Sequence, residues 1–204
     1  MRINFLTFLL LFLMSFTILA IEEPEFISIE KKDMFEIREY QPKLIAQVLV
    51  NGTFDTASNK GFRLLADFIF GNNKINEGPK KIDMTAPVII RDASEKIEMT
   101  APVISEETER GWYISFNMPK QYTRETLPDP NNSEVKIIDV PTEKFAVITF
   151  SGLVREKKYT EILNLLNEEM KKRNLDPKGS AILARYNPPW TLPFLRRNEL
   201  MLKF

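Results

Sequence analysis

The chain contains neither cysteine nor histidine among its 204 residues. Without these side chains it has no thiol nucleophile, no disulfide, no thiolate metal ligand and no imidazole base. Serine triads that depend on histidine are excluded for the same reason. Any ligand binding by this protein must therefore use other side chains.

An excess of charge of one sign is also missing, because 28 Lys and Arg residues balance 28 Asp and Glu residues. Nucleic-acid-binding proteins depend largely on basic residues that neutralise phosphates, so we expect no nucleic-acid partner. Phosphate-binding loops, dinucleotide fingerprints and metal-ligand spacings are absent from the sequence as well. No pair of carboxylates stands out for acid–base catalysis, and we predict that the protein is not an enzyme.

One long hydrophobic run is present, and it lies at the N-terminus. Phe5–Ile21 is apolar except for three hydroxyl residues, and it follows the positively charged Met1 and Arg2. Together with the small residue Ala20, this pattern is typical of a secretory signal peptide. We predict that residues 1–20 are removed and that the protein is exported to the periplasm or secreted. The alternative is an uncleaved membrane anchor, because the run is close to the shortest that spans a bilayer, about 17 residues. We expect membrane association only through this segment.

A nine-residue segment occurs twice in the middle of the chain. Lys81–Ile89 reads KIDMTAPVI and Lys96–Ile104 reads KIEMTAPVI, so the copies differ by one exchange of aspartate for glutamate. The proline in each copy cannot donate to a β-ladder and marks an irregular point. With residues 91–95 as a loop, the two copies are predicted to form a hairpin. Met84 and Met99 either face a large flat ligand or pack in the core.

Two halves of the chain show the same order of predicted elements. Alternating polarity predicts strands over residues 35–40 and 44–50, and apolar residues at three- and four-residue steps predict a helix that ends at Ile69, before Gly71. One hundred residues later the pattern recurs. Further predicted elements are strands at 111–118, 135–140, 143–150, 180–186 and 198–204 and a helix at 155–173, whereas residues 21–34 are interpreted as a polar lead-in. We predict an α+β fold, with duplicated strand–strand–helix–strand halves that form a curved antiparallel sheet or distorted barrel flanked by two helices.

Four motifs in order give the chain a family resemblance. They are FEIREY at residues 35–40, GFRLL at 61–65 followed by GNN at 71–73, the duplicated segment, and YNPPW at 186–190 followed by RRNEL at 196–200. In these motifs the chain resembles the SOUL/haem-binding protein family. The resemblance implies a single haem-binding domain over residues 27–204, folded as a distorted antiparallel barrel with two flanking helices.

The resemblance also implies a shallow apolar groove on the first helix as the tetrapyrrole site. Propionates would pair with Lys60 and Arg63 by charge-assisted hydrogen bonds. The predicted contacts are Lys60, Phe62, Arg63, Leu65, Ala66, Ile69, Met84 and Met99. Asn59 and Asp67 stand where related proteins can offer basic residues to propionates. The other interpretation of these residues is an ordinary solvated helix face over an ordinary core.

The implied function is that of an exported, non-enzymatic binding protein for haem or a related tetrapyrrole. Haem would be held non-covalently and reversibly, without ligation by histidine or cysteine. The alternative is a binding module for another large hydrophobic ligand, similar to bacterial effector-binding domains. In the C-terminal motif we expect Pro188 and Pro189 to fix a loop, Arg197 and Glu199 to support it, and Trp190 to pack. Attraction of an anionic group by the arginines is the other interpretation of this motif.

Overall fold

The computed structural model describes residues 21–75 and 94–204. Three predictions lie outside these residues, namely the signal peptide at residues 1–20, the first copy of the duplicated segment, and Met84 as a ligand contact. The hairpin between the two copies cannot be traced for the same reason.

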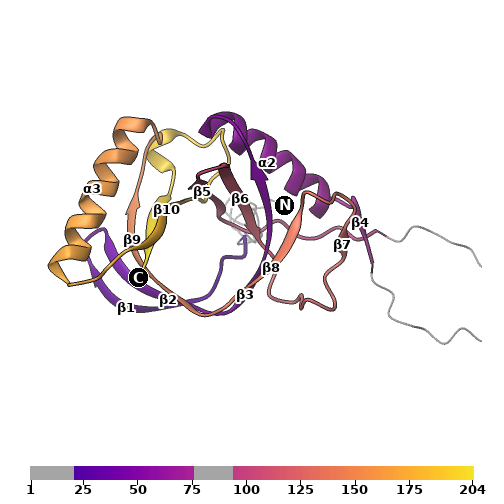
Figure 1. Cartoon of the computed structure of the whole chain (residues 1–204), viewed down its shortest axis with the longest axis horizontal. Coiled ribbons are helices and arrows are strands. Elements are labelled where there is room, and N and C mark those ends of the chain that lie inside the picture. Colours follow the sequence, from indigo (N-terminus) through magenta and orange to yellow (C-terminus); the bar gives the residue numbers. More distant parts are fainter. Residues whose placement is uncertain (1–20, 76–93) are drawn as a thin grey trace, which may run out of the picture.

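A nine-stranded antiparallel sheet forms the centre of the described structure, in the order β1-β2-β9-β11-β10-β5-β6-β3-β8. Figure 1 shows that this sheet curls into a half-barrel and that the two helices lie on its outer side. The elements of the sheet and its helices are β1 (Phe26–Lys32), β2 (Phe35–Tyr40), β3 (Lys43–Val50), α2 (Phe54–Ile69), β5 (Val103–Thr108), β6 (Gly111–Asn117), β8 (Lys136–Val140), β9 (Glu143–Phe150), α3 (Glu156–Lys172), β10 (Lys178–Arg185) and β11 (Asn198–Lys203). Two short strands, β4 (Asn73–Lys74) and β7 (Asp129–Pro130), pair separately, and a 3-10 turn, η1, covers Pro193–Leu195.

The strand order confirms the predicted duplication. From the central β10–β5 pair, the sheet continues as β11, β9 and β2 on one side and as β6, β3 and β8 on the other. Ala46 lies opposite Ile137, and Ala146 lies opposite Ile37, so both halves keep the same register. The first strand of each half pairs with the second strand of the other half. The two halves therefore exchange a strand and form one continuous sheet.

Strand alternation divides the buried side chains between the two faces of the sheet. On the outer face, α2 covers one apolar cluster with β3 and β6, and α3 covers a second cluster with β9 and β11. In β9, Ala146 and Ile148 belong to the cluster beneath α3, whereas Phe145 and Val147 face the other way. Because successive strand residues point to opposite faces, a third, smaller cluster occupies the inner face. Its members are Tyr40, Phe145, Val147, Ala184 and Met201.

The ends and the packing of α2 follow from a few local residues. Thr53 caps the helix, since its hydroxyl oxygen accepts a hydrogen bond from the backbone N–H of Thr56 at 3.5 Å. Gly71 follows the helix with φ of 117°, a conformation that glycine adopts without strain. A Cβ atom on Gly61 would lie 2.5 Å from the Ile114 side chain on β6. Glycine at the start of the GFRLL motif thus lets the helix pack directly on the sheet.

Two expectations differ from the structure. Residues 26–32, within the predicted lead-in, form β1, which pairs with β2 at the edge of the sheet. The second copy of the duplicated segment is irregular up to the cis proline Pro102 and becomes a strand only at Val103. That strand pairs with β6 and β10, so this copy supplies half of the central strand pair.

Candidate functional site

The outer surface of α2 holds the residues predicted to contact a tetrapyrrole. Lys60 and Arg63 are exposed, and Phe62 is 37% exposed while its ring contacts that of Phe116 edge-on at 5.4 Å. Leu65 and Ile69 are fully buried beneath the helix. These last two belong to the core, so the apolar stripe read from the sequence is largely the inward face of the helix.

One flank of α2 nevertheless carries apolar surface. Phe62, Ala66 and Phe70 follow each other at four-residue spacing, which places them on one side of the helix. Ala66 is buried, but Phe70 is 57% exposed. The segment around Lys96 runs along the same end of the helix, because the Lys96 ammonium lies 5.9 Å from the centre of the Phe70 ring. Phe70 was not among the contacts predicted from the sequence, although its four-residue spacing from Phe62 and Ala66 is a signal that could have identified it.

Met99, in the duplicated segment, is a further exposed apolar side chain. Its neighbour Ile97 is fully buried, and the Ile97 backbone N–H donates to the carbonyl of Ile69 at 2.8 Å. Thr100 is also buried, and its hydroxyl donates to the carbonyl of Asn117 at 2.5 Å. Met99 lies between these two buried residues and is itself 39% exposed.

The electrostatic setting of this flank suits an anionic ligand. Within the described part of the chain, Lys60, Arg63 and Lys96 form no ion pair with a carboxylate. The nearby Asp67 accepts a hydrogen bond from Asn72. Three cations without carboxylate partners in this part of the chain thus accompany three exposed apolar side chains: Lys60, Arg63, Phe62 and Phe70 on or at the end of α2, and Lys96 and Met99 on the segment that meets its C-terminal end. We call this set of six residues the α2 flank.

A cavity of about 560 Å³ lies elsewhere, between the N-terminal segment and the β2–β3 and β8–β9 turns. Its charged lining residues are Glu22, Glu23, Glu25, Glu125 and Asp139 against Lys43, Lys120 and Arg124. Burial lowers the pKa of Lys43 to about 8, an effect that Glu143 opposes. Because acidic residues outnumber basic ones and the Lys43 charge is disfavoured, this cavity is poorly suited to an anionic ligand.

The family motifs at both ends of the domain meet in a buried charge network on the inner face. The Arg38 guanidinium donates to Glu36 at 2.6 Å and to Glu199 at 2.9 Å, and all three residues are buried. Tyr186 donates to the same Glu199 oxygen at 2.6 Å, and Arg197 donates to its other oxygen at 3.2 Å. FEIREY and RRNEL thus supply the polar contacts that join β2 to β11. Arg197 was expected to support the proline loop together with Glu199; it contacts Glu199, and its backbone N–H donates to the Asn187 side chain at the start of that loop at 2.6 Å.

Proton affinities in this network favour its charged form. Burial by itself would lower the pKa of Arg38, but the Glu199 carboxylate raises it. Burial would likewise raise the pKa of Glu36, yet hydrogen bonds from Ser28 and Arg38 lower it. The pKa of Tyr186 is raised by burial and by Glu199. The network is therefore ionised, and its side chains bind one another, which is the arrangement of a structural contact.

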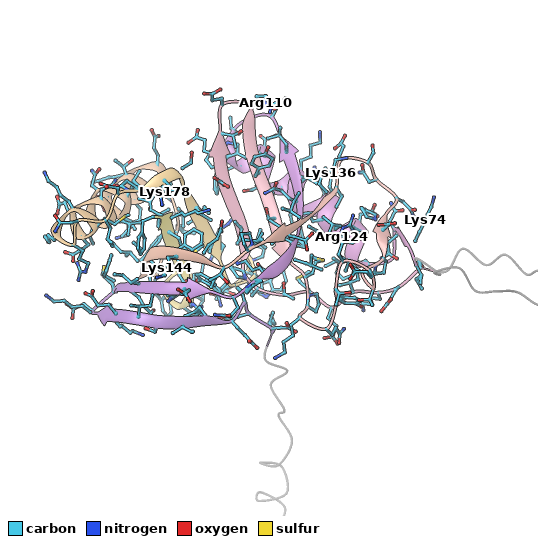
Figure 2. All side chains as sticks on the ribbon, turned by 60° about the horizontal axis from the view of Figure 1, so that its bottom comes forward. Lys74, Arg110, Arg124, Lys136, Lys144 and Lys178 are labelled. Atoms are coloured by element: carbon cyan, nitrogen blue, oxygen red, sulfur yellow. The ribbon has the colours of Figure 1, made fainter. Side chains whose placement is uncertain are left out.

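Residues 21–75 and 94–204 lack two features that mark other functional classes. This part contains no cluster of three or more acidic side chains arranged to hold a metal ion. It also contains no helix that is long and apolar enough to cross a membrane. The cations labelled in Figure 2 are spread across the molecule, from Lys144 and Lys178 at the α3 end to Lys74 at the other.

Comparison with known protein families gives one result that spans the whole described fold. The pattern of the SOUL heme-binding protein family matches residues 21–203. The chain belongs to the SOUL heme-binding protein family. This SOUL protein is accordingly a haem-binding protein at the level of its family. No curated protein matches its sequence.

Solved structures share the fold of this SOUL protein at low identity. A hydrolase from Listeria innocua is 14% identical, with a TM-score of 0.53 over 85% of this chain and 93% of that chain. The EcmrR C-terminal domain is 8% identical, with a TM-score of 0.53 over 83% of this chain and 95% of that chain. At such identities the similarity shows the fold alone.

Proposed function

We propose that this SOUL protein is an exported carrier that binds haem or a related tetrapyrrole reversibly on the α2 flank, without turnover. The observation that carries the proposal is the combination of exposed Phe62, Phe70 and Met99 with three cations that have no ion-pair partner among residues 21–75 and 94–204. A tetrapyrrole presents a flat apolar macrocycle and carboxylate side chains, which match these two kinds of side chain. Binding without turnover agrees with the absence of histidine and cysteine.

Each part of the α2 flank would have its own role. Phe62, Phe70 and Met99 would contact the macrocycle and remove apolar surface from water, which is the largest favourable contribution. Lys60, Arg63 and Lys96 would orient the propionates and add little free energy, because exposed ion pairs contribute only about 0–1 kcal/mol. No side chain of the flank is a strong ligand for ferric iron, so the iron would stay weakly ligated.

Haemin titration tests this proposal through matched variants. We expect Phe62→Ala to weaken haemin binding by roughly 10-fold, because burying an aromatic side chain contributes about 1.5–3 kcal/mol. The single variants Lys60→Ala and Arg63→Ala should each weaken it by no more than about 5-fold. The Soret band measures affinity, and the spectrum should be that of a weakly ligated ferric haem.

Ile27→Ala serves as the control, since Ile27 is an exposed apolar residue on β1, outside the α2 flank. If the control variant and Phe62→Ala bind haemin equally well, the α2 flank is not the site. Strong six-coordinate, low-spin bands would contradict weak ligation and would point to a methionine, tyrosine or lysine ligand.

The alternative function is binding of another large hydrophobic ligand on the same surface. Its support is that the apolar part of the α2 flank consists of aromatic and methionine side chains, which contact many flat molecules. Competition between haemin and other planar hydrophobic compounds separates the two proposals. Displacement of haemin by most compounds at similar concentrations would favour the general binding module.

Export is the second part of the proposal, and it rests on the sequence of residues 1–20. We expect that expression of the full gene yields a mature chain that starts at Ile21, because Ala20 is suited to the position before cleavage. N-terminal sequencing of the purified protein measures this. A chain that retains Met1 in the membrane fraction would show an uncleaved anchor.

A further inference from the structure

The loop before β11 exposes large apolar side chains that the α2 flank does not use. Trp190 is 82% exposed, Phe194 70% and Leu195 61%, and Leu192 and Leu153 are exposed beside them. The expectation that Trp190 packs against the protein is therefore wrong. A cluster of this kind on a water-soluble surface marks a contact with another hydrophobic phase or molecule.

Hydrogen bonds hold this loop in its extended position. The Arg196 guanidinium donates to the carbonyl of Thr191 at 2.8 Å and also to that of Pro189. The Gly152 N–H donates to the carbonyl of Pro193 at 3.0 Å, which ties the loop to the segment before α3. This tie brings Leu153 to the same edge of the molecule, where Figure 1 shows the loop beside the start of α3. The exposed apolar side chains thus lie on a loop whose backbone is fixed by hydrogen bonds.

The segments that carry these side chains are basic. Residues 151–155 and 185–198 contain four arginines and no carboxylate. Glu23 and Glu199 neutralise Arg197. Arg196, in contrast, bonds only to backbone carbonyls, and Arg155 is exposed and forms no ion pair in the described part of the chain. Positive charge therefore remains beside the apolar tip.

We propose that Trp190, Leu192, Phe194, Leu195 and Leu153 insert into the interface of an anionic lipid bilayer, with Arg155 and Arg196 at the headgroups. Tryptophan is enriched at the boundary between headgroups and acyl chains. Reversible attachment to a membrane surface generally needs two signals, apolar insertion and attraction to anionic lipids, and this loop supplies both. The proposal does not rest on haem binding and is separate from the contact predicted for residues 1–20.

Fluorescence of Trp190 in the full chain tests the proposal. The chain has two tryptophans, so Trp112→Phe leaves Trp190 as the single reporter. Vesicles of phosphatidylcholine with phosphatidylglycerol should shift its emission to the blue, and bromine-labelled acyl chains should quench it. Vesicles of phosphatidylcholine alone should give a weaker effect. This local signal distinguishes insertion of the loop from attachment through the apolar run at residues 5–21.

Variants at exposed positions keep the test independent of folding. Phe194→Asp and Leu195→Asp should each raise the lipid concentration needed for half of the Trp190 fluorescence change by roughly 10- to 100-fold. Arg155→Gln should raise this concentration roughly 5-fold on anionic vesicles only. Arg155 makes no side-chain capping bond to α3, so this change removes charge alone. The control is Ile27→Asp, an equally exposed apolar site on β1, which should leave the response unchanged.

Two results would overturn the proposal. One is a Trp190 emission that does not change on addition of anionic vesicles. The other is a blue shift that grows with protein concentration in the absence of lipid and disappears in Phe194→Asp, which would assign the loop to a contact between two copies of the chain.

Discussion

Replacing Arg38 by Met is expected to lower the free energy of unfolding by about 3–5 kcal/mol. Arg38 is the only guanidinium that contacts both Glu36 and Glu199 among the described residues. Without it, both carboxylates would stay buried without their main counter-charge, although Arg197 still donates to Glu199. Urea denaturation followed by circular dichroism measures the change. The matched control is Lys144→Met, which removes an exposed ion pair with Glu39 and should cost about 0–1 kcal/mol (Figure 2).

Neutralising the two carboxylates should restore part of the lost stability. The triple variant Arg38→Met, Glu36→Gln, Glu199→Gln removes the unpaired charges together, and we expect it to be more stable than Arg38→Met alone. An equal or lower stability of the triple variant would show that Arg38 acts mainly through packing, for example against the Phe26 ring 4.3 Å away.

The Arg38→Met variant should also differ from the unsubstituted protein in how its free energy of unfolding depends on pH. The pKa of Glu36 is lowered in the folded protein, so its ionised form stabilises the fold above the pKa of the unfolded chain. That stabilisation is lost as the pH falls through the lowered pKa. In Arg38→Met this acid-side loss should shrink, because a main cause of the lowered pKa has been removed.

Leu65→Asp is expected to unfold the protein. Leu65 is fully buried in the cluster between α2 and β3. Loss of a buried leucine costs about 2–5 kcal/mol, and burial of an unpaired carboxylate costs several more. The sum is comparable with the whole stability of a typical domain, about 5–15 kcal/mol. Loss of the cooperative thermal transition in circular dichroism would be the sign of unfolding.

Phe62→Asp is the matched variant for Leu65→Asp, three residues earlier on the same helix. Because Phe62 is 37% exposed, this carboxylate can reach water and the domain should remain folded. A folded Leu65→Asp that binds haemin weakly would instead place Leu65 at the ligand surface. Haemin binding must therefore be compared between variants whose folding has been measured.

The location of most elements could be predicted from residue patterns, and β1 shows where this fails. Alternation in residues 43–50 exists because one face of β3 is buried. In residues 35–40 it separates Phe35 and Ile37, which pack beneath α3, from the charged side chains of the buried network on the inner face. Every residue of β1 is exposed, so its strand conformation comes from pairing with β2 rather than from burial. A strand stabilised in this way carries no alternation of polarity. The exposure of Trp190 could not be predicted from local residue patterns either, because the loop that carries it is held by hydrogen bonds from Arg196.

The candidate site was predicted in part. Spacing of apolar residues identified α2, and the family resemblance then assigned Leu65 and Ile69 to a ligand surface, although they form the core. A 3.6-residue period marks the buried face of a helix, and it does not say whether protein or ligand covers that face. The surface that remains open lies along a flank, where Phe70 and Lys96 join Phe62.

The amino-acid sequence by itself determined the two-fold repeat of strand, strand and helix, because local periodicity follows from which residues must leave water. It also determined the chemistry that is excluded, since histidine and cysteine are missing. Only the tertiary structure decided that β2 pairs with β9 and β3 with β8, which makes one sheet from two halves. Strand exchange, the meeting of Arg38 with Glu199, and the exposure of Trp190 depend on contacts between residues far apart in the chain, and such contacts leave no local pattern.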